Sequence, residues 1–164
     1  MKKEAELKIR KAKKEDIAQI EEIYREGVVD EVKTQFPKKT KKNILKDFDK
    51  WKKEHKKSYK KDIKSLSERF IVALIEKEIV GFANAKIQSY DKTQGEINRI
   101  YLKRNWRGKK ISKALLKDLL MWLKSRKVDS VAAGMFIKNK KSRDLHKSFG
   151  FKNTAIRMQK KFKK

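Results

Sequence analysis

The 164-residue sequence predicts one α/β domain of the α+β type, with a mixed, mostly antiparallel sheet flanked by helices. The apolar residues switch between the alternation of strands and the 3–4 spacing of helices, in the order β-α-α-β-β-β-α-β-α-β. Three strands follow one another in the middle of the chain, which favours antiparallel pairing over a doubly wound parallel sheet. No repeat, linker or low-complexity segment divides the chain, so residues 1–164 are expected to form a single domain.

The chain begins with a predicted strand and a predicted helix. Residues 6–12 (ELKIRKA) alternate polar and apolar side chains, as a half-buried strand does. From Glu15 the apolar residues take helical spacing, which predicts an amphipathic helix ending near Gly27. Residues 28–39 contain the only proline, Pro37, and are predicted to be irregular.

A lysine-rich segment follows, predicted to form one long surface helix or two helices broken near Ser58. An apolar stripe recurs every three or four residues, so one face is expected to pack against the rest of the protein. The stripe consists of Ile44, Phe48, Trp51, His55, Tyr59, Ile63 and Leu66. Its aromatic residues are interpreted as core, and His55 has no second histidine or cysteine at ligand spacing, which argues against a metal site.

The middle of the chain supplies most of the predicted sheet. Residues 69–75 and 79–87 predict an antiparallel hairpin, and residues 95–102 predict the next strand. A helix with a strong apolar face is predicted from Ile111 to Leu123. Residues 130–137 (SVAAGMFI) are nearly all apolar, which is typical of a buried central strand.

Two short elements complete the predicted fold. Residues 139–149 predict a helix with Leu145 and Phe149 facing inward, and Gly150 is suited to ending it. Residues 151–162 predict a last strand.

Composition limits the classes of function. The net charge of +27 fits an RNA, DNA or ribosome partner, or else lysines that are simply solvated on every exposed face. The absence of cysteine excludes disulfides, thiolate metal sites and a cysteine nucleophile, and it fits a cytoplasmic location. No apolar run approaches the roughly 20 residues of a membrane span, and the N-terminal stretch lacks the apolar core of a signal peptide.

The junction between the strand at 95–102 and the next helix carries the strongest chemical signal. The amides at a helix N-terminus are free to bind anions. Arg104, Arg107, Lys109 and Lys110 crowd this helix start, where cations are unfavourable unless an anion is bound. The junction therefore predicts a polyphosphate site, although lysines occur throughout the chain.

A strand ends in Tyr101-Leu102, an Arg107-Gly108 turn opens a helix, and a later helix ends in Gly150-Phe151. On this combination the C-terminal half closely resembles the GCN5-related N-acetyltransferase (GNAT) family. The run of Asn, Ser and Leu-His before that Gly-Phe looks like the phosphinothricin-type amino-acid acetyltransferases. Lys110 and Ser112 depart from the family, which has glycines there that let the backbone approach a pyrophosphate.

The resemblance implies the acyl-CoA N-acyltransferase fold and direct transfer of an acetyl group from acetyl-CoA to a primary amine, with no metal. Residues 95–151 would bind acetyl-CoA, and residues 27–66 would lie on the acceptor side. Asn139 would bind the pantetheine arm or cap its helix, and the two roles are compatible. The other implied cofactor-binding residues are Ile100, Tyr101, Leu102, Arg107, Gly108, Lys109, Lys110, Ile111 and Ser112.

Two residues are implied to move protons. Glu96 matches the family position of a general base that works through water; a surface carboxylate paired with a lysine is the alternative. His146 stands where much of the family has a tyrosine that protonates the departing thiolate; a histidine that only packs against the channel is the alternative.

The sequence thus leaves two hypotheses of function. The first is an N-acetyltransferase for an amino acid or a protein or peptide amine. The second is a catalytically weakened module of the same fold that binds RNA, DNA or the ribosome through its basic surface. A homodimer is a further hypothesis about partners.

Overall fold

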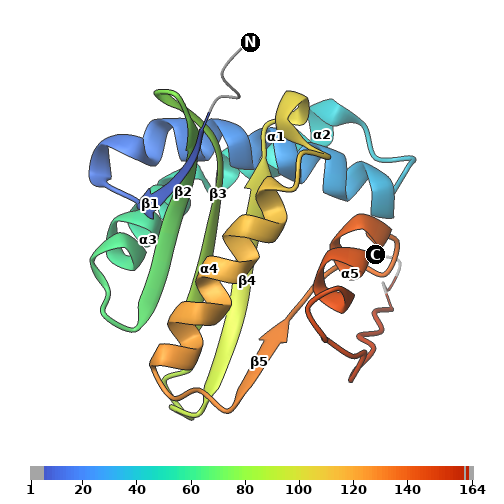
Figure 1. Cartoon of the computed structure of the whole chain (residues 1–164). Coiled ribbons are helices and arrows are strands. Elements are labelled where there is room, and N and C mark those ends of the chain that lie inside the picture. Colours follow the sequence, from blue (N-terminus) through green and yellow to red (C-terminus); the bar gives the residue numbers. More distant parts are fainter. Residues whose placement is uncertain (1–5, 161, 163–164) are drawn as a thin grey trace.

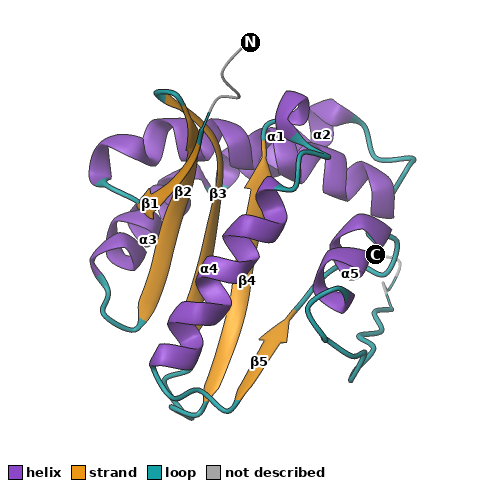
Figure 2. Ribbon diagram, viewed as in Figure 1, coloured by secondary structure: helices purple, strands orange, loops and turns teal. Residues whose placement is uncertain are grey.

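The computed structural model describes residues 6–160 and 162 and confirms a mixed sheet with helices on both faces (Figure 1, Figure 2). Within the described residues the sheet has five strands in sequence order. Antiparallel pairing joins β1 through β4, and β5 pairs parallel with β4. The strands are β1 (Leu7–Lys11), β2 (Glu68–Ile75), β3 (Glu78–Ile87), β4 (Gln94–Leu102) and β5 (Ser130–Ala133).

The helices divide between the two faces of the sheet. α1 and α3 pack on one face, with α2 against them, while α4 packs alone on the other and α5 lies beyond β5 (Figure 1). The α-helices are α1 (Ile17–Gln35), α2 (Lys41–Lys50), α3 (Lys52–Lys64), α4 (Ile111–Ser125) and α5 (Lys140–Lys147). Two 3-10 turns, η1 (Lys14–Asp16) and η2 (Arg104–Trp106), precede α1 and α4.

Alternation along the strands produces a separate apolar core on each face. On the α4 face, the fully buried leucines of α4 pack against alternate residues of β2 and β3 such as Ile71 and Ala83. On the other face, Phe70 and Phe82 pack against Ile20 of α1 and Tyr59 of α3. Burying one such large side chain contributes roughly 1.5–3 kcal/mol, so both faces must be covered.

Helix α1 continues to Gln35, so the predictions of an end near Gly27 and of an irregular segment at 28–39 were wrong. Gly27 is buried inside α1 beside Tyr101 of β4. A Cβ at Gly27 would lie 2.2 Å from Tyr101 Cδ1. The glycine therefore allows a close helix-to-strand approach and does not end the helix.

The lysine-rich segment forms two helices, and the break lies at Trp51 instead of Ser58. Thr40 caps α2 by accepting from the Asn43 amide at 3.2 Å. The change of direction turns the Trp51 side chain outward, so it is 52% exposed, and Leu66 beyond α3 is 82% exposed. The core prediction was wrong for these two residues and is confirmed for Ile44, Phe48 and Tyr59.

Two predictions at the C-terminal end were also wrong. The strand predicted at 130–137 is β5, an edge strand that ends at Ala133 with alternating exposure, and not a buried central strand. Residues 151–160 contain no strand, and Lys161 lies outside the described residues. The stretch from Lys152 to Lys160 is exposed throughout, because it has too few apolar residues to bury.

Arginine, which is scarce beside lysine, links elements that are far apart in sequence. Arg69 of β2 reaches Asp118 of α4 through two hydrogen bonds of 3.0 and 3.2 Å. Arg10 of β1 holds Asp16 of η1 through bonds of 2.6 and 2.9 Å. The planar guanidinium suits such two-point contacts with a carboxylate.

Candidate functional site

One edge of β4 is free over its C-terminal half. The pairing with β5 extends only from Gln94 to Ile97, which lies opposite Ala133. Beyond that point β5 ends and the chain turns away toward α5 (Figure 1). Residues 98–102, including Ile100, Tyr101 and Leu102, therefore have no strand partner on the β5 side among the described residues.

A β-bulge decides which way the side chains of β4 point. Arg99 pairs with Asn84 and Ile97 with Ala85, so the register skips Asn98. Ile97 and Leu102 pack on the α4 face, and Tyr101 packs toward α1. The extra residue puts Glu96, Arg99 and Tyr101 on the face that α1 and α3 cover.

The start of α4 presents a group of free backbone amides. Gly108 and Lys110 have positive φ angles, 79° and 61°. The first capping bonds of the helix come from Lys113 and Ala114, whose amides donate to the Lys110 carbonyl at 3.1 and 3.2 Å. The amides of residues 108–112 donate to no acceptor in the described part of the chain. Such a nest at a helix N-terminus binds anions, phosphate groups in particular.

The cations around this helix start divide into two groups. Arg107 Nη1 lies 2.6 Å from Asp30 Oδ2, and Arg107 Nε donates to the Leu102 carbonyl at 3.2 Å. Arg104 donates twice to Asp30, at 2.6 and 3.1 Å. The hydrogen bond from Arg104 is the main reason that the pKa of Asp30 is lowered. Both arginines thus bind α1, and Lys109 and Lys110 remain near the free amides.

Glu31 of α1 joins the end of β4 to the start of α5. The Tyr101 hydroxyl donates to Glu31 Oε2 at 2.7 Å, and Asn139 Nδ2 donates to Oε1 at 3.4 Å. Asn139 Oδ1 also accepts from the Ser142 amide at 3.1 Å, which confirms Asn139 as the cap of α5. Burial and the charge of Glu31 raise the pKa of Tyr101.

Glu96 lies near the start of β4 and is about one third exposed. Lys86 of β3 approaches its Oε2 at 3.1 Å, and Gln88 Nε2 donates to the same oxygen at 2.6 Å. Six residues separate it from Leu102, or roughly 20 Å along the strand. The predicted base and the predicted phosphate-binding turn therefore lie at opposite ends of β4.

His146 is buried in α5, with only 5% of its surface exposed. Its Nδ1 lies 2.8 Å from the Ser142 carbonyl oxygen, so Nδ1 carries a proton. Its Nε2 is buried and has no partner in the described part of the chain. Phe151 packs edge-on against the ring at 5.1 Å. Nε2 is therefore the ring nitrogen left without a partner in the described part of the chain.

Sequence reasoning missed Asp30 and Glu31. Both lie in α1, outside the motif residues that carry the family resemblance. One signal was present: α1 carries acidic residues at Glu22, Glu26 and Asp30, at a spacing of four, in a strongly basic chain.

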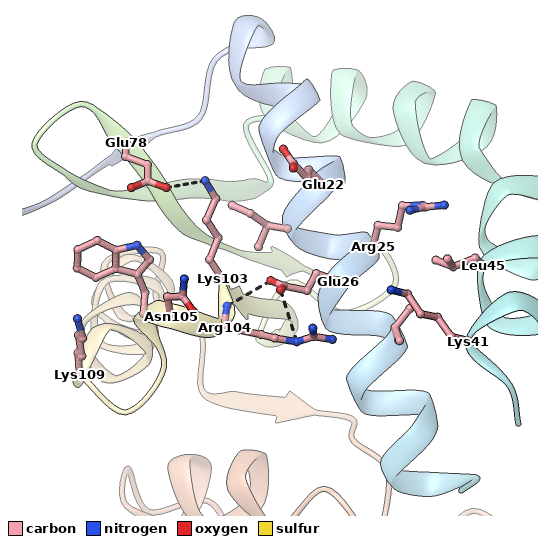
Figure 3. Close-up of a pocket in the computed structure, with 13 residues that line it drawn as sticks. Glu22, Arg25, Glu26, Lys41, Leu45, Glu78, Lys103, Arg104, Asn105 and Lys109 are labelled. Carbon is pink, nitrogen blue, oxygen red and sulfur yellow. Dashed lines mark hydrogen bonds and ion pairs between the residues drawn. The ribbon is translucent and has the colours of Figure 1, made fainter. Parts of the chain in front are cut away.

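A separate open hollow of about 830 Å³ crosses α1 between α2 and the η2 turn (Figure 3). Two of its carboxylates are paired, Glu26 with Arg104 and Glu78 with Lys103. Of the predicted site residues only Lys109 lines it. The hollow is therefore distinct from the free edge of β4.

Residues 6–160 and 162 contain no group of three side chains arranged to hold a metal ion. In the same residues, no helix combines the length and the apolar character needed to cross a bilayer.

A mixed sheet with a free β4 edge beside a nest of helix amides defines a class of enzymes that transfer acyl groups from coenzyme A. The sequence profile of the acetyltransferase (GNAT) family matches residues 28–151. The chain belongs to this family and is an acetyl-CoA-dependent N-acetyltransferase, with acetyl-CoA as its co-substrate.

Several solved structures share this fold. The PaiA N-acetyltransferase of Thermoplasma acidophilum, solved with coenzyme A, is 23% identical, with 90% of each chain covered and a TM-score of 0.74. An N-acetyltransferase of Staphylococcus aureus is 25% identical, with 92% of this chain and 86% of that chain covered and a TM-score of 0.65. A predicted acetyltransferase of Clostridium acetobutylicum, solved with acetyl-CoA, is 20% identical, with 95% and 96% covered and a TM-score of 0.71. No curated protein sequence matches the chain significantly.

Proposed function

We propose that the protein transfers the acetyl group directly to the primary amine of an amino acid, in the manner of the phosphinothricin-type enzymes, or of a protein or peptide. One observation carries the proposal: the free edge of β4 at 98–102 leads to the free amides at 108–112. A backbone edge can bind an extended amide-containing chain, and the amides can bind phosphates. The two sites fit the two ends of coenzyme A.

The residues of the nest fit a pyrophosphate. Lys110 stands where the family has glycine, and it adopts the left-handed conformation that glycine favours. The turn that exposes the amides is therefore kept even though lysine replaces glycine. Lys109 and Lys110 supply positive charge that Asp30 does not neutralise. We assign Ile100, Tyr101 and Leu102 to the pantetheine arm through their backbone, and Arg107, Gly108, Ile111 and Ser112 to the turn. When bound, acetyl-CoA supplies an acetyl group activated as a thioester.

We assign the transfer of protons to Glu96 and His146. Lys86 and Gln88 hold the Glu96 carboxylate, which would take a proton from the acceptor ammonium through a water. A protonated His146 would give up its Nε2 proton toward the departing sulfur. The neutral ring that remains has its proton on Nδ1, where the Ser142 carbonyl accepts it.

Calorimetry with acetyl-CoA and with coenzyme A tests whether the protein binds its co-substrate. Thiol release with a panel of amines tests whether it transfers the acetyl group. We expect Glu96→Gln and His146→Phe to lower turnover by roughly 10- to 100-fold and to leave acetyl-CoA affinity within about twofold. Glu15→Gln is the matched control, because Glu15 is an exposed glutamate of η1, outside the proposed cofactor and acceptor regions. Failure to bind coenzyme A saturably would contradict the proposal.

Several finer predictions accompany this function. We propose that residues 95–151 form the acetyl-CoA-binding core and that residues 27–66, with α1 and α3, form the acceptor side. Association with RNA or the ribosome, a homodimer and a cytoplasmic location stay predictions. Strong, salt-dependent binding of RNA that does not change when coenzyme A is added would favour the nucleic-acid hypothesis instead.

A further inference from the structure

A cluster of polar side chains, which we call the Arg99 cluster, lies where α1 and α3 cover the sheet. Strand register sets its base: Asn84 and Arg99 are neighbours across β3 and β4, and Glu68 lies one row away beside Lys86 and Glu96, which border the cluster. Helices α1 and α3 cover it on the side that faces away from the sheet. The cluster comprises Glu21, Tyr24, His55, Ser58, Tyr59, Asp62, Glu68, Asn84 and Arg99.

The cluster holds most of the unpaired buried polar atoms of the described residues. Five of the six such side-chain atoms belong to it: Glu21 Oε1, His55 Nδ1, Tyr59 OH, Glu68 Oε2 and Asn84 Nδ2. Tyr59 and Asn84 are each 0% exposed. An unpaired buried polar atom costs about 1–3 kcal/mol, so five in one place indicate a site that is completed by a bound molecule.

Arg99 has free donors at the centre of this cluster. Its guanidinium lies 5.5 Å from the rings of both Tyr24 and Tyr59. Its Nη1 donates a long hydrogen bond of 3.5 Å to Asn84 Oδ1. The side chain is 22% exposed, so it is not fully closed off from solvent. An arginine held this way can bind a carboxylate through two hydrogen bonds.

The acidic neighbours leave this guanidinium available. Asp62 Oδ2 stays 4.0 Å from Arg99 Nη1 and accepts instead from Ser58 Oγ at 3.0 Å. Burial and the charge of Asp62 raise the pKa of Glu68. The other charged groups that face Glu68 are Lys86 and Arg99.

We propose that the Arg99 cluster binds the carboxylate of the acceptor, which makes the acceptor a small molecule with both an amine and a carboxylate. Arg99 takes the carboxylate by two N–H donors, and Asn84 Nδ2 and the Tyr59 hydroxyl donate to the same group. The β-bulge puts Glu96 on the same face, three residues before Arg99 and roughly 10 Å along the strand. The acceptor amine can therefore face the predicted base while its carboxylate lies in the cluster. This inference rests on the proposed function.

The test uses the whole chain, acetyl-CoA and two matched sets of acceptors. One set contains the proteinogenic amino acids and the other contains their carboxamides, which keep the amine and lose the negative charge. Thiol release gives kcat/KM for each pair, and calorimetry gives the affinity for acetyl-CoA. For the best amino acid we expect kcat/KM to exceed that of its carboxamide by roughly 30-fold or more.

Variants of Arg99 test whether this residue causes the preference for amino acids over their carboxamides. Arg99→Met should remove most of the preference by raising KM for amino acids, with acetyl-CoA affinity within about twofold of the parent value. Arg99→Lys keeps the charge and should retain part of the preference, so it tests the cluster even if Arg99→Met folds poorly. The control is Arg126→Met, because Arg126 is exposed at the far end of α4.

The outcomes separate the inference from the function on which it rests. Equal use of amino acids and carboxamides, with acetyl-CoA still bound and consumed, overturns the carboxylate site and leaves the acetyltransferase intact. A preference that survives in Arg99→Met places the carboxylate elsewhere and overturns the inference too. A chain that does not bind acetyl-CoA overturns the proposed function and the inference together.

Discussion

Arg107 Nη1 and Asp30 Oδ2 lie 2.6 Å apart, although 77 residues separate them in the sequence. The contact attaches the turn that opens α4 to the middle of α1. Arg104 binds the same carboxylate from the η2 turn. Two arginines expected at a phosphate site thus also fix α1 over the end of β4, where Glu31 meets Tyr101.

Replacing Asp30 by Asn should destabilise this attachment. The lowered pKa of Asp30 means that its stabilising effect is full above the unfolded-state pKa of about 4 and is lost as the pH falls through the folded-state value. At pH 7 we expect Asp30→Asn to lower the free energy of unfolding by about 1 kcal/mol, discounted for its partial exposure. The difference from the parent protein should shrink near pH 3.

Denaturant titrations at pH 7 and pH 3 measure both effects. Asp47→Asn is the control, since Asp47 pairs with Lys39 on the exposed surface and should leave stability unchanged. A loss of the same size at both pH values would contradict the role of the ionised carboxylate.

Replacing Lys110 by Gly should stabilise the protein. Lys110 has φ 61°, a left-handed conformation that costs a non-glycine residue roughly 1 kcal/mol. The gain is reduced by the greater freedom of glycine in the unfolded chain, so we expect a rise of about 0.5 kcal/mol in the free energy of unfolding.

Lys109→Gly is the contrasting variant for Lys110→Gly. Lys109 lacks a positive φ angle and its ammonium lies 4.3 Å from the centre of the Trp106 ring. This variant should be destabilised, because it loses that contact and gains unfolded-state entropy. A destabilised Lys110→Gly protein would show that the left-handed turn is not the strained feature.

Replacing Gly27 by Ala should push α1 away from β4. The added Cβ would lie 2.2 and 2.8 Å from two carbons of the Tyr101 ring. We expect a loss of about 1–3 kcal/mol in thermal or chemical unfolding, the usual effect of overpacking. Gly134→Ala is the control, because a Cβ there meets nothing within 4 Å. Equal stability of the two variants would refute the close approach of α1 and β4.

Replacing Tyr101 by Phe should remove one hydrogen bond and little packing. The Tyr101 hydroxyl donates to Glu31 at 2.7 Å, so we expect a loss of about 1 kcal/mol in the free energy of unfolding. Tyr90→Phe controls for the substitution itself, since Tyr90 is 78% exposed. If both variants unfold at the same denaturant concentration as the parent, Glu31 does not join β4 to α5 in solution.

Much of the fold could be predicted because local pattern and tertiary structure agree there. The hairpin of β2 and β3 and the apolar face of α4 have the period and length of their elements. The cap at Asn139 and the positive φ of Gly150 follow from residue type in the same way.

The rest depended on partners distant in sequence. Gly27 looks like a helix end in the sequence, because its close contact with Tyr101 of β4 is visible only in the structure. The run from Ser130 looks like a buried central strand because it is nearly all apolar, and an apolar run does not show which neighbouring strands are absent. Asp30 and Glu31 reach η2, β4 and α5, and no local pattern in α1 specifies those contacts.

Arginine makes the two-point contacts with carboxylates that link elements in the described part of this protein, whereas lysine dominates its surface. Reductive methylation modifies lysine ammonium groups, keeps their positive charge and leaves guanidinium groups untouched. A fully methylated sample should therefore keep its fold and its arginine–carboxylate contacts while its many surface lysines become less hydrated. Lysine methylation is thus a way to change the surface of this protein for crystallisation without breaking the contacts that link its elements.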